Sequence, residues 1–95
     1  MKTPSFSFAG RTALVTGASR GIGQAISLAL AQAGATVIVA AREVSSLEET
    51  RALITAGGGQ VSAQALDVAD TGSIARCFAA IGKPLDILVN NAGTE

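Results

Sequence analysis

A glycine-rich segment between two apolar stretches constrains this chain more than any other feature. Residues 16–23 read T-G-A-S-R-G-I-G and follow an apolar run at residues 13–15. This pattern predicts a strand, a tight turn and the start of a helix, where backbone N–H groups can hold a nucleotide pyrophosphate. Gly17, Gly21 and Gly23 then serve the tight turn, the close approach of a phosphate, and the contact between helix and strand.

The rest of the sequence alternates strand-like and helix-like stretches. Strands are predicted at residues 12–16, 36–40, 61–66 and 87–90. An apolar stripe predicts the first helix, which Gly34 ends; its members are Ile22, Ala25, Ile26, Ala29, Leu30 and Ala33. The repeated unit favours an α/β fold with a doubly wound parallel sheet, formed by one small domain over residues 1–95. Residues 1–9 could form a loose N-terminal arm.

Capping residues mark two further helices. Ser45 and Ser46 each precede a glutamate by three positions, so two capping boxes could open the second helix. Leu47 and Ile54 line the predicted buried side of this helix, and the glycines at 57–59 end it. Gly59 is far from the glycine-rich turn, so Gly59→Ala should leave that turn unchanged. The third helix could be capped by Asp70, Thr71 or Ser73. Its predicted apolar face consists of Ile74, Cys77, Phe78 and Ile81.

Composition narrows the classes of function. Seven basic and seven acidic residues cancel, which gives no electrostatic case for binding nucleic acid or an anionic membrane. The absence of histidine removes His-based acid–base chemistry and His-ligated metals, and no metal site is predicted. The single cysteine, Cys77, fits a reducing compartment. Neither a signal peptide nor an apolar run of about 18 residues is visible, so the cytoplasm is the expected location.

Three motifs in order resemble the classical short-chain dehydrogenase/reductase family. They are the T-G-x-x-x-G-I-G turn, Asp67-Val68 after the third strand, and N-N-A-G at residues 90–93. The resemblance extends from about Gly10 to Gly93, and the subgroup most similar is the 3-oxoacyl-(acyl-carrier-protein) reductases. It implies a truncated Rossmann-type sheet of about four strands in the order 3-2-1-4, with three helices. It also implies an oxidoreductase of small carbonyl or alcohol substrates that binds a dinucleotide, in a family whose members are usually homo-oligomers.

The resemblance also implies a set of cofactor-binding residues. Asp67 would bind the adenine amino group with help from the backbone of Val68, although an Asp here could equally serve a turn or cap the third helix. Asn90 would contact a ribose through its backbone, and small residues at 92 and 93 would let the ribose or nicotinamide approach; a purely structural Asn-rich turn is the alternative. The full set is Gly17, Ser19, Arg20, Gly21, Ile22, Gly23, Arg42, Asp67, Val68, Asn90, Ala92 and Gly93. Thr16 could touch the ligand or stabilise the turn, and Asn91 is expected to tie strands together.

Two arginines favour NADP(H) over NAD(H). NAD-preferring members of the family carry an Asp at the end of the second strand, whereas this chain has Ala41 followed by Arg42. A guanidinium can pair with a 2′-phosphate through two hydrogen bonds. Arg20, next to a helix N-terminus where a cation is disfavoured, would contact the same phosphate. The competing interpretations are a solvated Arg20 and a surface pair of Arg42 with Glu43.

No catalytic residue is predicted in this chain. The family transfers hydride with a Tyr-x-x-x-Lys pair and a Ser that follow N-N-A-G, and the sequence contains no tyrosine. The prediction is the cofactor-binding N-terminal part of an NADP-dependent short-chain reductase, inactive by itself, whose substrate binds only to a full-length form. A stand-alone nucleotide-binding module and an inactive remnant are the alternatives.

Overall fold

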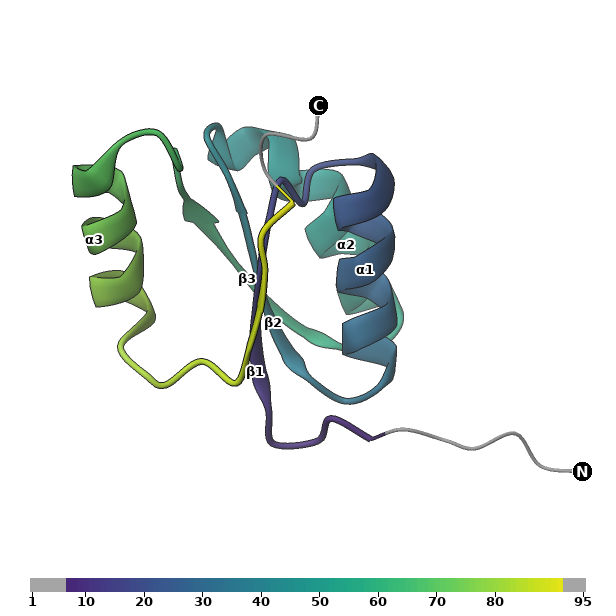
Figure 1. Ribbon diagram of the computed structural model, residues 1–95. Coiled ribbons are helices and arrows are strands. Elements are labelled where there is room, and N and C mark those ends of the chain that lie inside the picture. Colours follow the sequence, from purple (N-terminus) through teal and green to yellow (C-terminus); the bar gives the residue numbers. More distant parts are fainter. Residues whose placement is uncertain (1–6, 92–95) are drawn as a thin grey trace, which may run out of the picture.

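The computed structural model describes residues 7–91 as a parallel sheet covered by helices on both faces. The elements, in chain order, are β1 (Thr12–Thr16), α1 (Gly21–Gln32), β2 (Thr36–Ala41), the short 3-10 helix η1 (Val44–Leu47), α2 (Glu48–Ala56), β3 (Gln60–Ala65), α3 (Thr71–Ile81) and β4 (Ile87–Val89). α1 and α2 lie together on one face, and α3 covers the other (Figure 1). None of the helices in this part of the chain is long and apolar enough to cross a membrane.

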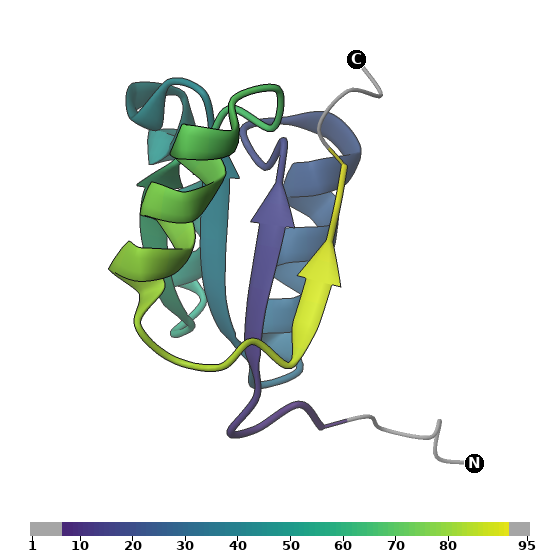
Figure 2. The ribbon, with the colours of Figure 1, turned by 60° about the vertical axis from the view of Figure 1, so that its left-hand side comes forward.

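The strand order is β3-β2-β1-β4, and every adjacent pair is parallel. This confirms the predicted fold class and the predicted strand order. Parallel strands bring their carboxyl ends to one edge of the sheet, and in this topology the chain crosses from one face to the other after β3. Figure 2 shows β4 at the outer edge of the sheet beside β1.

Two apolar clusters hold the helices to the sheet. Ala13, Val15, Val37 and Val39 face α1 and α2 and pack with Leu47 and Ile54, as predicted for these last two. Alternate residues of the same strands, Leu14, Ile38 and Ala40, form the second cluster with Leu66, which follows β3, and Cys77 of α3. Because successive residues of a strand point to opposite faces, a strand covered on both sides is apolar throughout. All residues of β1 are accordingly buried.

Neighbouring chain segments anchor the start of β1. The Asp86 N–H donates to the Thr12 carbonyl at 2.9 Å, and the Asp86 carboxylate accepts from the Thr12 N–H at 2.8 Å. On the N-terminal side, the Phe8 N–H donates to the Ala33 carbonyl at 2.7 Å, and the Phe8 ring packs against the core. Residues 7–9 are the part of the predicted N-terminal arm that the structure describes.

The buried face of α1 differs from the predicted stripe. Ile26 and Leu30 pack on the core, but the fully buried residues are Gly23 and Ser27, and the Ile22 side chain is 69% exposed. The physical reason is close packing: a Cβ at Gly23 would meet the Gly17 carbonyl, so only the smallest residue fits between helix and turn. Hydrophobic periodicity does not detect a face built from Gly and Ser.

The predicted capping boxes of α2 are wrong. The Ser46 hydroxyl donates to the Glu43 carbonyl at 2.6 Å, and α2 starts after Leu47 without a side-chain cap. The 3-10 turn η1 takes up the residues in which the boxes were expected, because its own backbone bonds satisfy the start of the helix.

The limits of α3 follow its capping residues. Asp70 is the cap among the three predicted candidates, accepting from the Gly72 N–H at 2.9 Å, and Gly82 ends the helix at φ +65°. Cys77 is buried, but Phe78 is 44% exposed and does not belong to the buried face. Adjacent helix positions are rotated by about 100°, so a helix that turns Cys77 to the sheet turns Phe78 away from it.

Candidate functional site

The turn between β1 and α1 lies over the carboxyl edge of the sheet. Gly17 and Gly21 both have φ +60°, the left-handed conformation that glycine adopts without strain. The Ala18 N–H donates to the Ala40 carbonyl at 3.2 Å, which fixes the turn to the end of β2. Arg20 is the N-cap residue of α1 in an extended conformation and makes no side-chain cap hydrogen bond.

The first N–H groups of α1 face the predicted site. The helix offers no carbonyl four residues earlier to the N–H groups of Gly21, Ile22 and Gly23. The first such hydrogen bond is made by the Gln24 N–H, which donates to the Arg20 carbonyl at 3.4 Å. With the helix dipole behind them, such groups stabilise an anion. The Ile22 side chain is exposed to solvent.

Gly23 has a structural reason to be glycine. A Cβ at this position would lie 2.8 Å from Asn91 Nδ2 and would also meet the Gly17 carbonyl group. The close approach of helix and strand predicted for the third glycine therefore occurs here. It brings the glycine turn into contact with the segment after β4.

A cleft of about 460 Å³ opens beside this turn, within the range of small-molecule sites. Its lining consists of Gly17, Ser19, Ala41, Arg42, Glu43, Ser46, Leu66, Asp67, Val68 and Ala69. The structure thus brings together five of the predicted residues, which are Gly17, Ser19, Arg42, Asp67 and Val68. Arg20, Gly21, Ile22, Gly23 and Asn90 lie outside its lining. Ala92 and Gly93 lie outside the described residues.

Most polar residues of the cleft come from the loops after β2 and β3, and Ser19 comes from the glycine turn. Arg42 and Glu43 both line it, and among residues 7–91 they form no ion pair with each other, so the predicted alternative of a surface pair is not what the structure shows. Ser46 lines the cleft as well, and sequence reasoning missed this because it assigned Ser46 to a helix cap. Its place one short loop after β2 was the only available signal.

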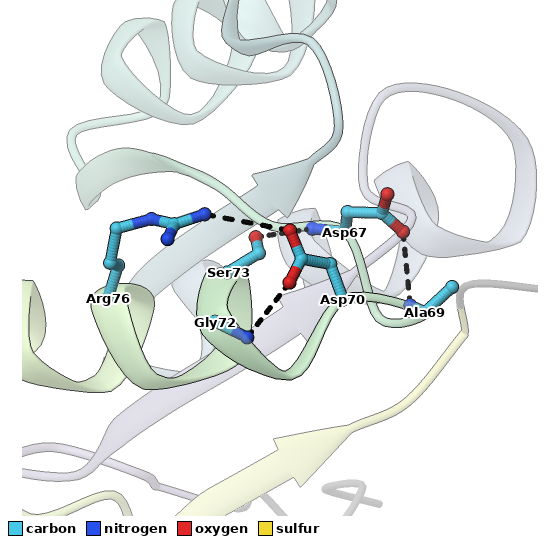
Figure 3. A network of polar contacts seen from close by, with 6 residues as sticks. All are labelled: Asp67, Ala69, Asp70, Gly72, Ser73 and Arg76. Atoms are coloured by element: carbon cyan, nitrogen blue, oxygen red, sulfur yellow. Dashed lines mark hydrogen bonds and ion pairs between the residues drawn. The ribbon is translucent and has the colours of Figure 1, made fainter.

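Asp67 lies at a tight corner between β3 and α3 (Figure 3). One of its carboxylate oxygens accepts from the Ala69 N–H at 3.0 Å, and the other points away from that turn. Its own N–H donates to the Ser73 hydroxyl at 2.9 Å. Asp70, not Asp67, caps α3 and approaches Arg76 at 3.7 Å. Asp67 therefore supports a turn with one oxygen and keeps the second directed away from it.

The segment after β4 is tied to the end of β1. The Thr16 hydroxyl accepts from the Asn91 N–H at 2.9 Å and lies 3.1 Å from Asn90 Oδ1. Asn91 Nδ2 donates to the Gly17 carbonyl at 3.1 Å, so Asn91 ties the two segments together as predicted. Of the two interpretations of Thr16, the structure favours stabilisation of the turn.

Cys77 and the acidic side chains offer no metal chemistry within residues 7–91. Burial raises the pKa of the Cys77 thiol above its ordinary value, since the interior disfavours the thiolate. In the same part of the chain, no three Cys, Asp or Glu side chains are placed to hold an ion together. Cys77 is a core residue, in agreement with its predicted position.

Comparisons with known proteins agree with this geometry. A family model described as "short chain dehydrogenase" matches residues 11–95. The 3-oxoacyl-(acyl-carrier-protein) reductase of rhamnolipid biosynthesis from Pseudomonas aeruginosa is 44% identical, over 97% of this chain and 37% of that protein. Gluconate 5-dehydrogenase from Gluconobacter oxydans is 42% identical, over 95% and 36%. The chain thus spans little more than a third of the length of these relatives.

Solved structures show the same fold. The Pseudomonas aeruginosa RhlG complex with NADP has a TM-score of 0.84 and 43% identity, and the match covers 98% of this chain and 38% of that one. A metagenomic short-chain oxidoreductase in complex with NADP has a TM-score of 0.82 and 43% identity, with 96% and 42% covered.

Proposed function

The chain belongs to the short-chain dehydrogenase family, and from this premise we propose that it is the NADP(H)-binding N-terminal portion of an oxidoreductase of carbonyl or alcohol substrates. The observation that carries the proposal is the cleft at the carboxyl edge of the sheet. It joins the glycine turn to Arg42 and Asp67 and has alanine, not a carboxylate, at position 41. Similar chains crystallised with NADP support it.

The residues present fit a dinucleotide. Its pyrophosphate would rest on the N–H groups of Gly21, Ile22 and Gly23. A Cβ added at Gly21 would meet no atom within 4 Å, so there is open space beside this residue. In this arrangement the Asp67 oxygen that points away from its turn accepts from the adenine amino group, and the Val68 backbone lies beside it. Asn90 and, outside the described residues, Ala92 and Gly93 would border the ribose and nicotinamide.

Preference for the 2′-phosphate rests on charge. Arg42 lines the cleft directly after Ala41, so a phosphate there would meet a guanidinium and no aspartate. Glu43 lines the same cleft and opposes the anion, but Arg42 can make two charge-assisted hydrogen bonds to it. Arg20, the N-cap residue of α1, is the second proposed partner of this phosphate.

A chemical-shift map tests where the cofactor binds. Titration of the isotope-labelled chain with NADPH should perturb backbone amides in the turn at residues 17–23, in the loop at 42–46 and in the corner at 67–69. These are the segments around the cleft. Amides of α3 beyond Ser73, on the other face of the sheet, should not move. Perturbations centred on α3 would place the site elsewhere and contradict the proposal.

The chain alone should not transfer hydride, which the nicotinamide supplies when bound. Carbonyl reduction needs a positioned acid, and this sequence has no tyrosine and no histidine. Lys83 lies between α3 and the amino end of β4, whereas the cleft lies at the carboxyl ends of the strands. The test is NADPH oxidation with a panel of ketones and aldehydes. Turnover above the protein-free control, lost together with dinucleotide binding in Gly23→Ala, would contradict the proposal.

The remaining properties concern a full-length form. We propose that the catalytic Tyr, Lys and Ser, the small-molecule substrate site and the contacts of a homo-oligomer come from residues beyond this chain. The cytoplasmic location expected from the sequence stays a prediction.

A further inference from the structure

Thr50 is a buried hydroxyl that the proposed cofactor contacts leave unexplained. It lies in the first turn of α2, and its side chain is fully buried. Its Oγ1 donates to the Ala18 carbonyl at 2.7 Å and lies 3.4 Å from the Ser19 carbonyl. Both acceptors belong to the glycine turn, more than thirty positions earlier in the chain. A valine of the same shape would leave the buried Ala18 carbonyl without this donor, so the hydroxyl serves the glycine turn.

Gln24 completes the arrangement from α1. Its Nε2 donates to Thr50 Oγ1 at 3.0 Å and lies 3.4 Å from the Ser19 carbonyl. Thr50 Oγ1 therefore accepts one hydrogen bond and donates another, which fixes the direction of its proton. α1 and α2 lie side by side on one face of the sheet (Figure 1), and these side chains connect both helices to the turn.

The orientation of the two carbonyls determines that of two N–H groups. The peptide bonds of the described residues are all trans, and in a trans peptide the N–H points opposite to the C=O. The Ala18 and Ser19 carbonyls are directed at Thr50 and Gln24, so the N–H groups of Ser19 and Arg20 point away from α2. The Ser19 N–H makes no hydrogen bond to another described residue, and Ser19 lines the cleft.

We infer that Thr50, held by Gln24, is a positioning residue for the pyrophosphate: it fixes the peptide plane between Ala18 and Ser19 so that the Ser19 N–H joins the N–H groups of α1. This inference rests on the proposed function. Thr50 touches the turn and not the ligand. Its effect should therefore appear with both NADPH and NADH, which share the pyrophosphate.

The test compares Thr50→Val with Thr50→Ser. Loss of the hydroxyl should weaken the binding of both dinucleotides by about tenfold, the effect of one lost buried hydrogen bond. Thr50→Ser should keep most of the affinity. Two controls on the same helix are Thr55→Val, at an exposed threonine, and Ile54→Val, which loosens the core one turn further on. Both should bind like the parent, although Ile54→Val should unfold at a lower temperature.

A second readout needs no ligand. In the unliganded chain, Thr50→Val should shift the NMR resonances of the Ala18 and Ser19 carbonyl carbons toward those of unbonded carbonyls, and Thr50→Ser should not. Unchanged carbonyl resonances in Thr50→Val, or Thr50→Ser binding as weakly as Thr50→Val, would overturn the inference. If the parent chain binds neither dinucleotide, the proposed function fails, and the carbonyl resonances alone decide whether Thr50 orients the turn.

Discussion

Gly23→Ala should abolish measurable binding of either dinucleotide and lower the free energy of unfolding by about 1–3 kcal/mol, the usual cost of overpacking. The added Cβ would lie 2.8 Å from Asn91 Nδ2 and 2.9 Å from the carbonyl carbon of Gly17, and it would also meet the Gly17 oxygen. The Gly17 backbone cannot move without displacing the turn itself. Urea denaturation measures the stability, and calorimetric titration with NADPH measures the binding.

The matched control is Gly57→Ala. Gly57 caps α2 at φ −83°, and a Cβ there would meet nothing closer than 3.6 Å. Gly57→Ala should therefore bind both dinucleotides as the parent does. Gly59, the control expected from the sequence, is unsuitable because its Cβ would lie 2.8 Å from Ile54 Cγ2 and 3.1 Å from Ala31 Cβ. Binding by Gly23→Ala at the parent's affinity would show that helix and turn need not touch.

Arg42→Asp should reverse the cofactor preference. The change removes the proposed partner of the 2′-phosphate and adds an acceptor for ribose hydroxyls next to Ala41. A hydrogen bond to a charged group contributes about 1.5–3 kcal/mol, so NADPH should bind at least tenfold more weakly while NADH binds more tightly. Because Arg42 is exposed, the effect on NADPH should shrink as salt increases.

Lys83→Asp is the control for this experiment. It changes the net charge by the same amount at an exposed position before the amino end of β4, away from the carboxyl ends of the strands. Both affinities should stay near those of the parent. If Lys83→Asp weakened NADPH binding as much as Arg42→Asp, the preference would reflect overall charge and not a contact at the end of β2.

The sheet could be predicted because its strands are buried on both faces. Residues 13–15 and 37–40 are apolar without interruption, and the strand limits agree with the structure to within a residue or two. The buried face of α1 could not be predicted, since Gly23 and Ser27 are chosen for small size, not for hydrophobicity. The start of α2 was also missed, because Ser46 bonds backward to Glu43.

The glycine turn and the residues after β2 and β3 were found from motifs in order. The structure places Gly17, Ser19, Arg42, Asp67 and Val68 around one cleft, whereas their roles toward a cofactor stay predictions. What the sequence could not reveal is support from distant segments. Nothing in the pattern around Thr50 indicates that its hydroxyl reaches the Ala18 carbonyl, because that contact depends on how α2 packs beside α1.

The most direct test of the proposed function is calorimetric titration of the unmodified chain with NADPH and, separately, with NADH, at low and matched salt. NADPH should bind at one site per chain, at least about tenfold more tightly than NADH, as expected from one charge-assisted contact to the 2′-phosphate. Equal affinities, or no heat of binding with either dinucleotide from a chain whose circular dichroism shows it to be folded, would contradict the proposal.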